Sequence, residues 1–276
     1  VQPTEPVGYW RFHETTGTTT ANDGSGAGLD GVYVNATLGA YGPRPSQFKG
    51  FESTNRALTF TASKSGYVTV SNSVLNQRGA FALGGWIKPS ATPGSNVGLL
   101  GQHGCVEFGF LNATNLECRT PGGGSVRAAY TNAVNTWHHV IAQGDGSSMQ
   151  IYIDGVLAGA GGTPTANYGS SSFHFKIGGG GIQDATGNFF NGQIDEVVVY
   201  HRALAESEIK LLYQAGFNAM NVPVTPYVNT DLGPAMSNRN ASAYLRLPFV
   251  VAEPTNVTLL TLRVRFNDGF VAFLNG

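Results

Sequence analysis

The sequence predicts an all-β protein whose main domain is an antiparallel β-sandwich. Short runs of apolar and β-branched residues recur about every ten residues, with turn residues between them. Glycine supplies 38 of the 276 residues, and only 12% of residues are charged, against about 25% in an average soluble domain. A single segment, residues 205–214, has the period of an amphipathic helix. Turn-rich β structure accounts for all three observations.

The expected strands follow one another along the chain. An aromatic run at residues 7–12 comes first, and a polar loop rich in Thr and Gly follows at residues 13–31. Further strands are predicted where β-branched and aromatic residues gather, at residues 57–60, 67–70, 81–87, 98–101, 106–110, 126–130, 137–143, 149–153, 173–177 and 193–200.

Two local signals define how strands are connected and where the pattern ends. Asp154-Gly155 lies between two apolar runs and predicts a two-residue hairpin turn. After the strand at residues 193–200, residues 201–204 form a turn and the amphipathic helix follows. The helix is expected to end near Gly216, because glycine favours the C-terminal cap.

Composition changes after the helix, which predicts a domain boundary. Residues 1–217 are expected to form the sandwich, and residues 218–226 read as a Pro-containing linker. Residues 227–276 are again strand-rich. About fifty residues are marginal for an independent sandwich, so this segment is expected to be an incomplete β-rich module.

Charge and hydropathy narrow the possible partners and the location. The net charge of −1 gives no attraction to nucleic acid or to an anionic membrane, and no apolar run reaches the roughly 18 residues of a membrane span. Low charge with abundant Ser, Thr and Asn is common in exported proteins, so an extracellular or cell-surface location is expected. Sequons for glycosylation, if the source permits it, occur at Asn35, Asn112, Asn240 and Asn256.

The two cysteines, Cys105 and Cys118, flank a predicted hairpin with a turn at residues 112–115. Cysteines at the feet of a hairpin can lie close enough to bridge, so a disulfide is predicted. The alternative is a pair of unpaired thiols in the core. A zinc site is not expected, because His103 is the only further ligand nearby.

Several short motifs, in a fixed order over residues 6–217, carry a family resemblance: Gly8–Phe12, Asn22–Gly31, Phe81–Ile87, Asn135–Val140, Gln150–Gly155 and Gly192–Tyr200. In these motifs the chain resembles the laminin-G-like, concanavalin A-like lectin/glucanase superfamily, in the form common in bacterial secreted multidomain proteins. The resemblance implies a jelly-roll-type sandwich of two antiparallel sheets. Ala205 departs from the family pattern, which usually has Ser or Thr there to cap the helix. Residues 263–276 more loosely resemble the start of a second β-sandwich module.

The resemblance also implies calcium as a structural cofactor. Members often hold the ion with an aspartate of an early loop and the aspartate of the last strand, which match Asp23 and Asp195. Ser25 and Asp30 are further oxygen donors, and calcium takes six to eight oxygens. The alternative is that Asp23 and Asp30 only close turns through side-chain hydrogen bonds.

No catalytic motif is found, so the chain is not expected to be an enzyme. Family members that cleave glucans carry two glutamates on one strand around an aspartate, and this spacing is absent. Glu107 and Glu117 are expected near the concave face, but with a different spacing. Asp195 and Glu196 are adjacent and should point to opposite faces of the strand.

Two other groups of residues are expected to be structural. His138 and His139 are consecutive in a strand, so their side chains should diverge and not bind one metal. Trp10, Trp86 and Trp137 fall in strand patterns and are expected in the core.

Ligand binding is the function that remains. Sugar sites combine exposed aromatic rings with polar groups that bind hydroxyls. The loop candidates are Tyr41, His103, Tyr130, Tyr168, Asp184, Asn188 and Phe189. The alternative is that the aromatic side chains among them only cover the ends of the sandwich.

The prediction is therefore a non-catalytic extracellular recognition or adhesion module that binds a glycan or a surface protein, with structural calcium. One alternative is a structural subunit of a surface filament or layer, in which copies of the chain complete one another by β-strand addition. A glucan hydrolase is the second alternative.

Overall fold

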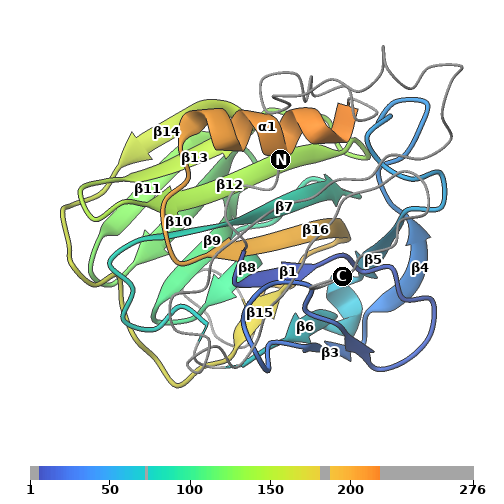
Figure 1. The fold of residues 1–276 in the computed structure, drawn as a ribbon, viewed down its shortest axis with the longest axis horizontal. Helices are drawn as coiled ribbons and strands as arrows, with labels where there is room; N and C mark the ends of the chain where they lie inside the picture. Colours follow the sequence, from blue (N-terminus) through green and yellow to red (C-terminus); the bar gives the residue numbers. More distant parts are fainter. Residues whose placement is uncertain (1–5, 72–73, 181–186, 218–276) are drawn as a thin grey trace, which may run out of the picture. The chain divides into compact units, whose positions relative to one another are not determined.

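The computed structural model describes residues 6–71, 74–180 and 187–217. The predicted linker, the second β-rich module, Asp184, Asn240 and Asn256 lie outside the described residues. Within the described ranges, a pair of antiparallel sheets packs into a sandwich, and one helix lies against strands of one sheet (Figure 1). The predicted all-β sandwich of jelly-roll type is confirmed.

Sheet A has the strand order β14-β13-β12-β7-β16-β5-β4, and β1 pairs with β16 off this path. The bounds of its strands are β1 Gly8–Trp10, β4 Thr37–Tyr41, β5 Arg56–Phe60, β7 Phe81–Pro89, β12 His138–Gly144, β13 Met149–Ile153, β14 Val156–Gly161 and β16 Gly192–Tyr200.

Sheet B has the order β11-β10-β9-β8-β15-β6-β3-β2. The bounds of its strands are β2 Thr19–Thr20, β3 Gly31–Val34, β6 Tyr67–Thr69, β8 Val97–Gln102, β9 Val106–Asn112, β10 Asn115–Thr120, β11 Gly124–Ala129 and β15 Phe175–Ile177. A short 3₁₀ turn, η1, covers Ala62–Lys64. The sequence pattern missed β2, β3 and β4, which have only two, four and five residues.

The main core fills the space between the two sheets. Trp10 of β1 is fully buried there, and its ring stacks on Phe175 of β15 at 5.7 Å between centroids. Trp86 is also buried, but it faces the helix side of sheet A, where Tyr213 stacks on it. Trp137 is only half-buried, so the prediction of a core position is wrong for this residue.

A second apolar cluster lies on the other face of sheet A, beneath α1 (Glu206–Phe217). Ile209 of the helix is buried against Ile141 and Tyr152 of β12 and β13. The helix begins without a side-chain cap from Ala205. Glu208 supplies the other half of a capping box, because its carboxylate accepts the Ala205 N–H at 2.8 Å. No helix in the described ranges is long and apolar enough to cross a bilayer.

Strand β16 contains a β-bulge. Asp195 lies opposite Trp86 of β7, and the next registered pair joins Val198 to Gly84. One strand therefore has an extra residue over this stretch. Glu196, within the bulge, takes a left-handed backbone conformation with φ of 50°.

The Asp154-Gly155 turn is confirmed. Both residues have positive φ, 51° and 76°, as the type I′ hairpin requires. The Asp154 carboxylate lies 2.7 Å from His138 Nδ1 and accepts the backbone N–H of His139 at 2.9 Å. His138 packs against Tyr130 of the main core, whereas His139 is buried beside Trp86 on the helix side. The expected divergence of the two histidines is confirmed.

The predicted disulfide is wrong, because Cys105 and Cys118 are free, buried thiols. The hairpin register pairs Cys118 with Phe108, so Cys105 lies three residues further along. At about 3.3 Å per strand residue, that offset is roughly 10 Å, beyond the reach of a disulfide. The Cys105 thiol instead lies 3.2 Å from the Leu75 carbonyl, and burial raises its pKa to about 11.

The free thiols give a first prediction. Titration of the urea-unfolded protein with a thiol reagent, without a reductant, should count two thiols, and the folded protein should react slowly because burial suppresses thiolate formation. A count of zero in the unfolded chain would contradict this hairpin register.

His139 gives a second prediction. Burial lowers the pKa of His139 from 6.5 to about 4, so the unfolded state binds its proton first as the pH falls. The free energy of unfolding is therefore unaffected by this group above pH 6.5. As the pH falls from 6.5 to 4, protonation of the unfolded state lowers it by roughly 2–3 kcal/mol. Urea unfolding at pH 7 and 4.5 should show that His139→Leu loses less stability than the parent over this interval. Equal losses would show that another group titrates.

Candidate functional site

On the outer face of sheet B, much of the surface at β8 and β9 is formed by backbone atoms. Gly98 of β8 lies opposite Gly109 of β9, and Gly101 lies opposite Glu107. A Cβ at Gly109 would come within 2.1 Å of the Val97 carbonyl oxygen, so glycine is required there. Because the glycines have no side chains, the surface is recessed here between neighbouring residues that have them.

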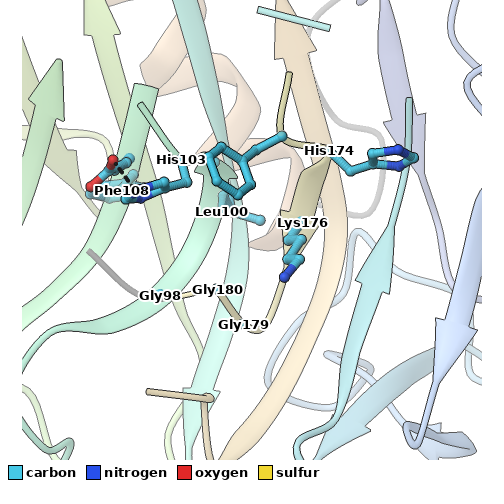
Figure 2. Close-up of a pocket in the computed structure, with 11 residues that line it drawn as sticks. Gly98, Leu100, His103, Phe108, His174, Lys176, Gly179 and Gly180 are labelled. Atoms are coloured by element: carbon cyan, nitrogen blue, oxygen red, sulfur yellow. Dashed lines mark ion pairs between the residues drawn. The ribbon is translucent and has the colours of Figure 1, made fainter. Parts of the chain in front are cut away.

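The first hollow on this face lies above β8, β9 and β15. Figure 2 shows His103 on one side of it and His174 and Lys176 on the other. The Glu107 carboxylate accepts the Gly104 N–H at 2.8 Å and lies 3.1 Å from His103 Nδ1. The hollow holds only about 20 Å³, room for about one water molecule. This hollow is therefore too small to enclose a sugar ring.

Aromatic side chains lie beside the first hollow. Phe173 is 46% exposed, and its ring meets that of His103 edge to face at 4.9 Å. Tyr67 and Phe189 stack at 5.9 Å, and the Lys176 ammonium lies 4.7 Å from the Tyr67 ring. We call Tyr67 and Phe189 the aromatic ridge.

The second hollow lies beyond the aromatic ridge, at one end of the sandwich, and Phe189 forms part of its wall. Its volume is about 640 Å³, within the range of about 300–1,000 Å³ that is usual for ligand pockets. No ionisable side chain lines it among the residues that the structure describes. Its polar lining consists of hydroxyls and amides, from Ser63, Thr92, Ser95, Asn188 and Asn191.

Glu117 of β10 is a buried carboxylate on the same face of the sheet. Its side chain is only 1% exposed, and its Oε1 accepts a bond from Arg127 Nε at 2.9 Å. The other oxygen, Oε2, is buried without a hydrogen-bond partner in the described residues. The Arg127 guanidinium therefore compensates for the hydration that the Glu117 carboxylate loses on burial.

The structure brings together some of the residues that the sequence singled out for ligand binding, and not others. His103 borders the first hollow, and Asn188 and Phe189 border the second. Tyr41 is exposed, but it belongs to β4 in the other sheet. Sequence reasoning missed Tyr67 and Phe173, which fall within or beside predicted strands. The outward orientation of Tyr67 follows from the alternation of β6, in which Val68 faces the core. Phe173 precedes β15, and alternation with the buried Phe175 does not predict its exposure.

Tyr130 and Tyr168 were wrong as ligand candidates, because both are buried in the main core. The Tyr130 ring meets Phe110 edge to face at 5.0 Å. Tyr168 meets Phe81 at 4.8 Å, and its hydroxyl donates to the Ser148 carbonyl and accepts the Gly146 N–H. Their rings seal the interior, as the alternative interpretation stated.

Asp195 lies in a separate, buried polar network in sheet A. Its two oxygens accept hydrogen bonds from Asn55 Nδ2 at 2.7 Å and from the Glu196 N–H at 2.9 Å. Asn55 Oδ1 in turn lies 2.7 Å from His13 Nε2. Glu196 binds the Tyr9 hydroxyl and lies 3.2 Å from Arg11 Nε. Burial raises the pKa of both Asp195 and Glu196 above their usual ranges.

These contacts bear on the expected calcium ion. N–H donors occupy the positions from which a cation would bind the Asp195 oxygens. The residues as placed therefore do not fit an ion there unless Asn55 moves. Asp23 and Asp30 are exposed, and Asp30 accepts the Asn22 N–H. The described residues contain no group of three or more His, Cys, Asp or Glu suited to a metal. Calcium binding by Asp23, Ser25, Asp30 and Asp195 stays a prediction from the family resemblance.

Comparison with known families supports the fold derived above. A family model described as the concanavalin A-like lectin/glucanases superfamily matches residues 62–210, just over half of the chain. The chain belongs to this superfamily. No curated protein sequence matches it significantly.

Two solved structures share this fold at low sequence identity. A Trypanosoma rangeli sialidase, in complex with 2,3-difluorosialic acid, is 20% identical with a TM-score of 0.57, over 79% of this chain and 34% of the sialidase. The binding domain of Paraclostridial Mosquitocidal Protein 1 is 15% identical with a TM-score of 0.56, over 78% and 53% of the two chains. The chain thus matches only about a third of the sialidase and half of the binding domain.

The Glu117–Arg127 pair gives a third prediction. Arg127→Ala should lower the free energy of unfolding by about 2 kcal/mol, because it leaves a buried carboxylate unpaired. Adding Glu117→Gln should recover most of that loss, since the charge is then gone. Urea unfolding of the parent, the two single variants and the double variant measures the coupling. Additive effects would show that the pair contributes nothing.

Proposed function

We propose that this chain is a non-catalytic glycan-binding module, and that the glycan lies across the outer face of sheet B. The aromatic ridge carries the proposal. It places two stacked, partly exposed rings between a shallow charged hollow and a larger neutral one. Aromatic faces pack on the apolar faces of sugar rings, and flanking polar groups bind hydroxyls.

The depth of the surface favours an extended ligand. The first hollow admits about one water molecule, so a single sugar ring cannot be enclosed there. A polysaccharide that runs over the aromatic ridge would instead contact Phe173 on one side and the amide-lined hollow on the other. The neutral lining of the second hollow favours uncharged sugar units at that end.

The environment of the two glutamates supports a binding role over hydrolysis. Glycoside hydrolysis requires one carboxyl group as proton donor and a second as base or nucleophile. Here Glu117 is paired with Arg127, and Glu107 with His103 and the Gly104 N–H. These contacts fix both carboxylates in place as structural members of the sheet. The low charge and turn-rich composition support an extracellular setting.

A fourth prediction tests the aromatic ridge. Tyr67→Ala and Phe189→Ala should each weaken binding to the best ligand of a neutral polysaccharide panel about tenfold, because each removes one stacking face. Affinity electrophoresis selects the ligand, and calorimetry measures the dissociation constants.

Leu157→Ala is the control for this test, since Leu157 is an exposed apolar residue on β14 of the other sheet. It should bind as the parent does. Melting temperatures identify any variant that is unfolded. Unchanged binding by folded Tyr67→Ala and Phe189→Ala variants, or binding of no polysaccharide by the folded parent, would overturn the proposal.

A further inference from the structure

An exposed cluster on the edge strand of sheet A joins one tyrosine to two arginines. Tyr41, at the end of β4, is 52% exposed. The Arg44 guanidinium carbon lies 3.5 Å from the centre of its ring, and that of Arg56 lies 4.6 Å from the same centre. Arg56 is the register partner of Tyr41 on β5, and Arg44 follows in the adjoining loop.

The two arginines are close, and carboxylates do not neutralise them. Their guanidinium carbons share one ring, so they are no more than about 8 Å apart, a separation at which like charges repel appreciably. Among the described residues neither side chain has a carboxylate partner. The nearest acidic residue in the segment, Glu52, pairs with Arg11 instead.

Stacking on the ring orients both guanidinium groups but leaves most of their donors available. A stacked guanidinium uses its face, while its N–H bonds lie in the plane and point outward. Arg56 donates one bond to the Gly39 carbonyl at 3.2 Å. The remaining donors form the planar arrangement that binds carboxylate or sulfate oxygens in pairs. Hydrogen bonding from Arg44 and Arg56 lowers the pKa of the Tyr41 hydroxyl, and their positive charge lowers it further.

We propose that Tyr41, Arg44 and Arg56 form a binding site for an oxyanion, a carboxylate or sulfate group carried by an acidic polysaccharide. The bound anion would relieve the repulsion between the two arginines, whose side chains are already held in place by the ring. This site shares no residue with the surface on sheet B, so it adds recognition of acidic sugar units and does not depend on the neutral glycan site.

The fifth prediction tests this site at fixed ionic strength, with heparin as the sulfated probe, polygalacturonate as the carboxylated probe and dextran as the uncharged probe. Arg44→Gln and Arg56→Gln should each weaken binding of the charged probes at least tenfold, since each removes charged hydrogen bonds of the kind worth about 1.5–3 kcal/mol. Tyr41→Leu should weaken binding less, because it removes the platform but neither charge.

Lys49→Gln is the matched control, because it removes the same charge from the same loop but Lys49 does not belong to the stack. It should change binding less than twofold. An equal effect of Lys49→Gln and Arg44→Gln would show general electrostatic attraction and overturn the site, as would binding of neither acidic probe by the folded parent. Binding of one probe alone identifies the group as sulfate or carboxylate. The Phe189→Ala variant should keep its affinity at this site, which separates failure of this inference from failure of the neutral glycan site.

Discussion

The bulge in β16 is the constraint on which the arrangement of sheet A depends. Ile194 precedes it and faces the core between the sheets, and simple alternation would then place Val198 and Tyr200 in that core as well. The extra residue reverses the alternation. Val197 and Val199 complete the main core instead, and Val198 and Tyr200 face α1. One strand thereby contributes side chains to two apolar clusters. The left-handed backbone conformation of Glu196 costs of order 1–2 kcal/mol.

The same bulge explains why strong polar interactions lie inside sheet A. Where the alternation reverses, the backbone turns Asp195 toward Asn55 and Glu196 toward Tyr9 and Arg11. A buried carboxylate is tolerated only when donors compensate for lost hydration, and this network supplies them. Gly42 belongs to the same requirement, because a Cβ there would approach Asp195 Oδ2 to 2.7 Å. Around the bulge, sheet A is thus covered on both faces, whereas the outer face of sheet B carries the first hollow.

Much of this could be predicted from the sequence, and what was missed has physical causes. Period-2 patterns and turn residues located the longer strands within one or two residues, and Asp154-Gly155 specified its hairpin. The run from Val197 to Tyr200 is apolar at every position, so its pattern carries no trace of the bulge. The predicted disulfide failed because hairpin register depends on where the turn closes. Tyr130 and Tyr168 were misplaced because an aromatic residue at a strand end or in a polar loop gives the same sequence pattern whether its ring faces solvent or the core.

The distribution of charge separates arginines that stabilise the fold from those that can meet a ligand. In a chain with so few charged residues, Arg11, Arg127 and Arg202 each lie beside a glutamate, and each holds a carboxylate that would otherwise be costly to bury or would leave a helix end uncapped. Arg44 and Arg56 compensate no such group. Stacking on an exposed ring restricts their rotamers and leaves most of their donors available, which lowers the conformational entropy that is lost when an oxyanion binds. An arginine pair held in this way is organised for an acceptor from outside the chain, whereas the paired arginines have already found theirs within it.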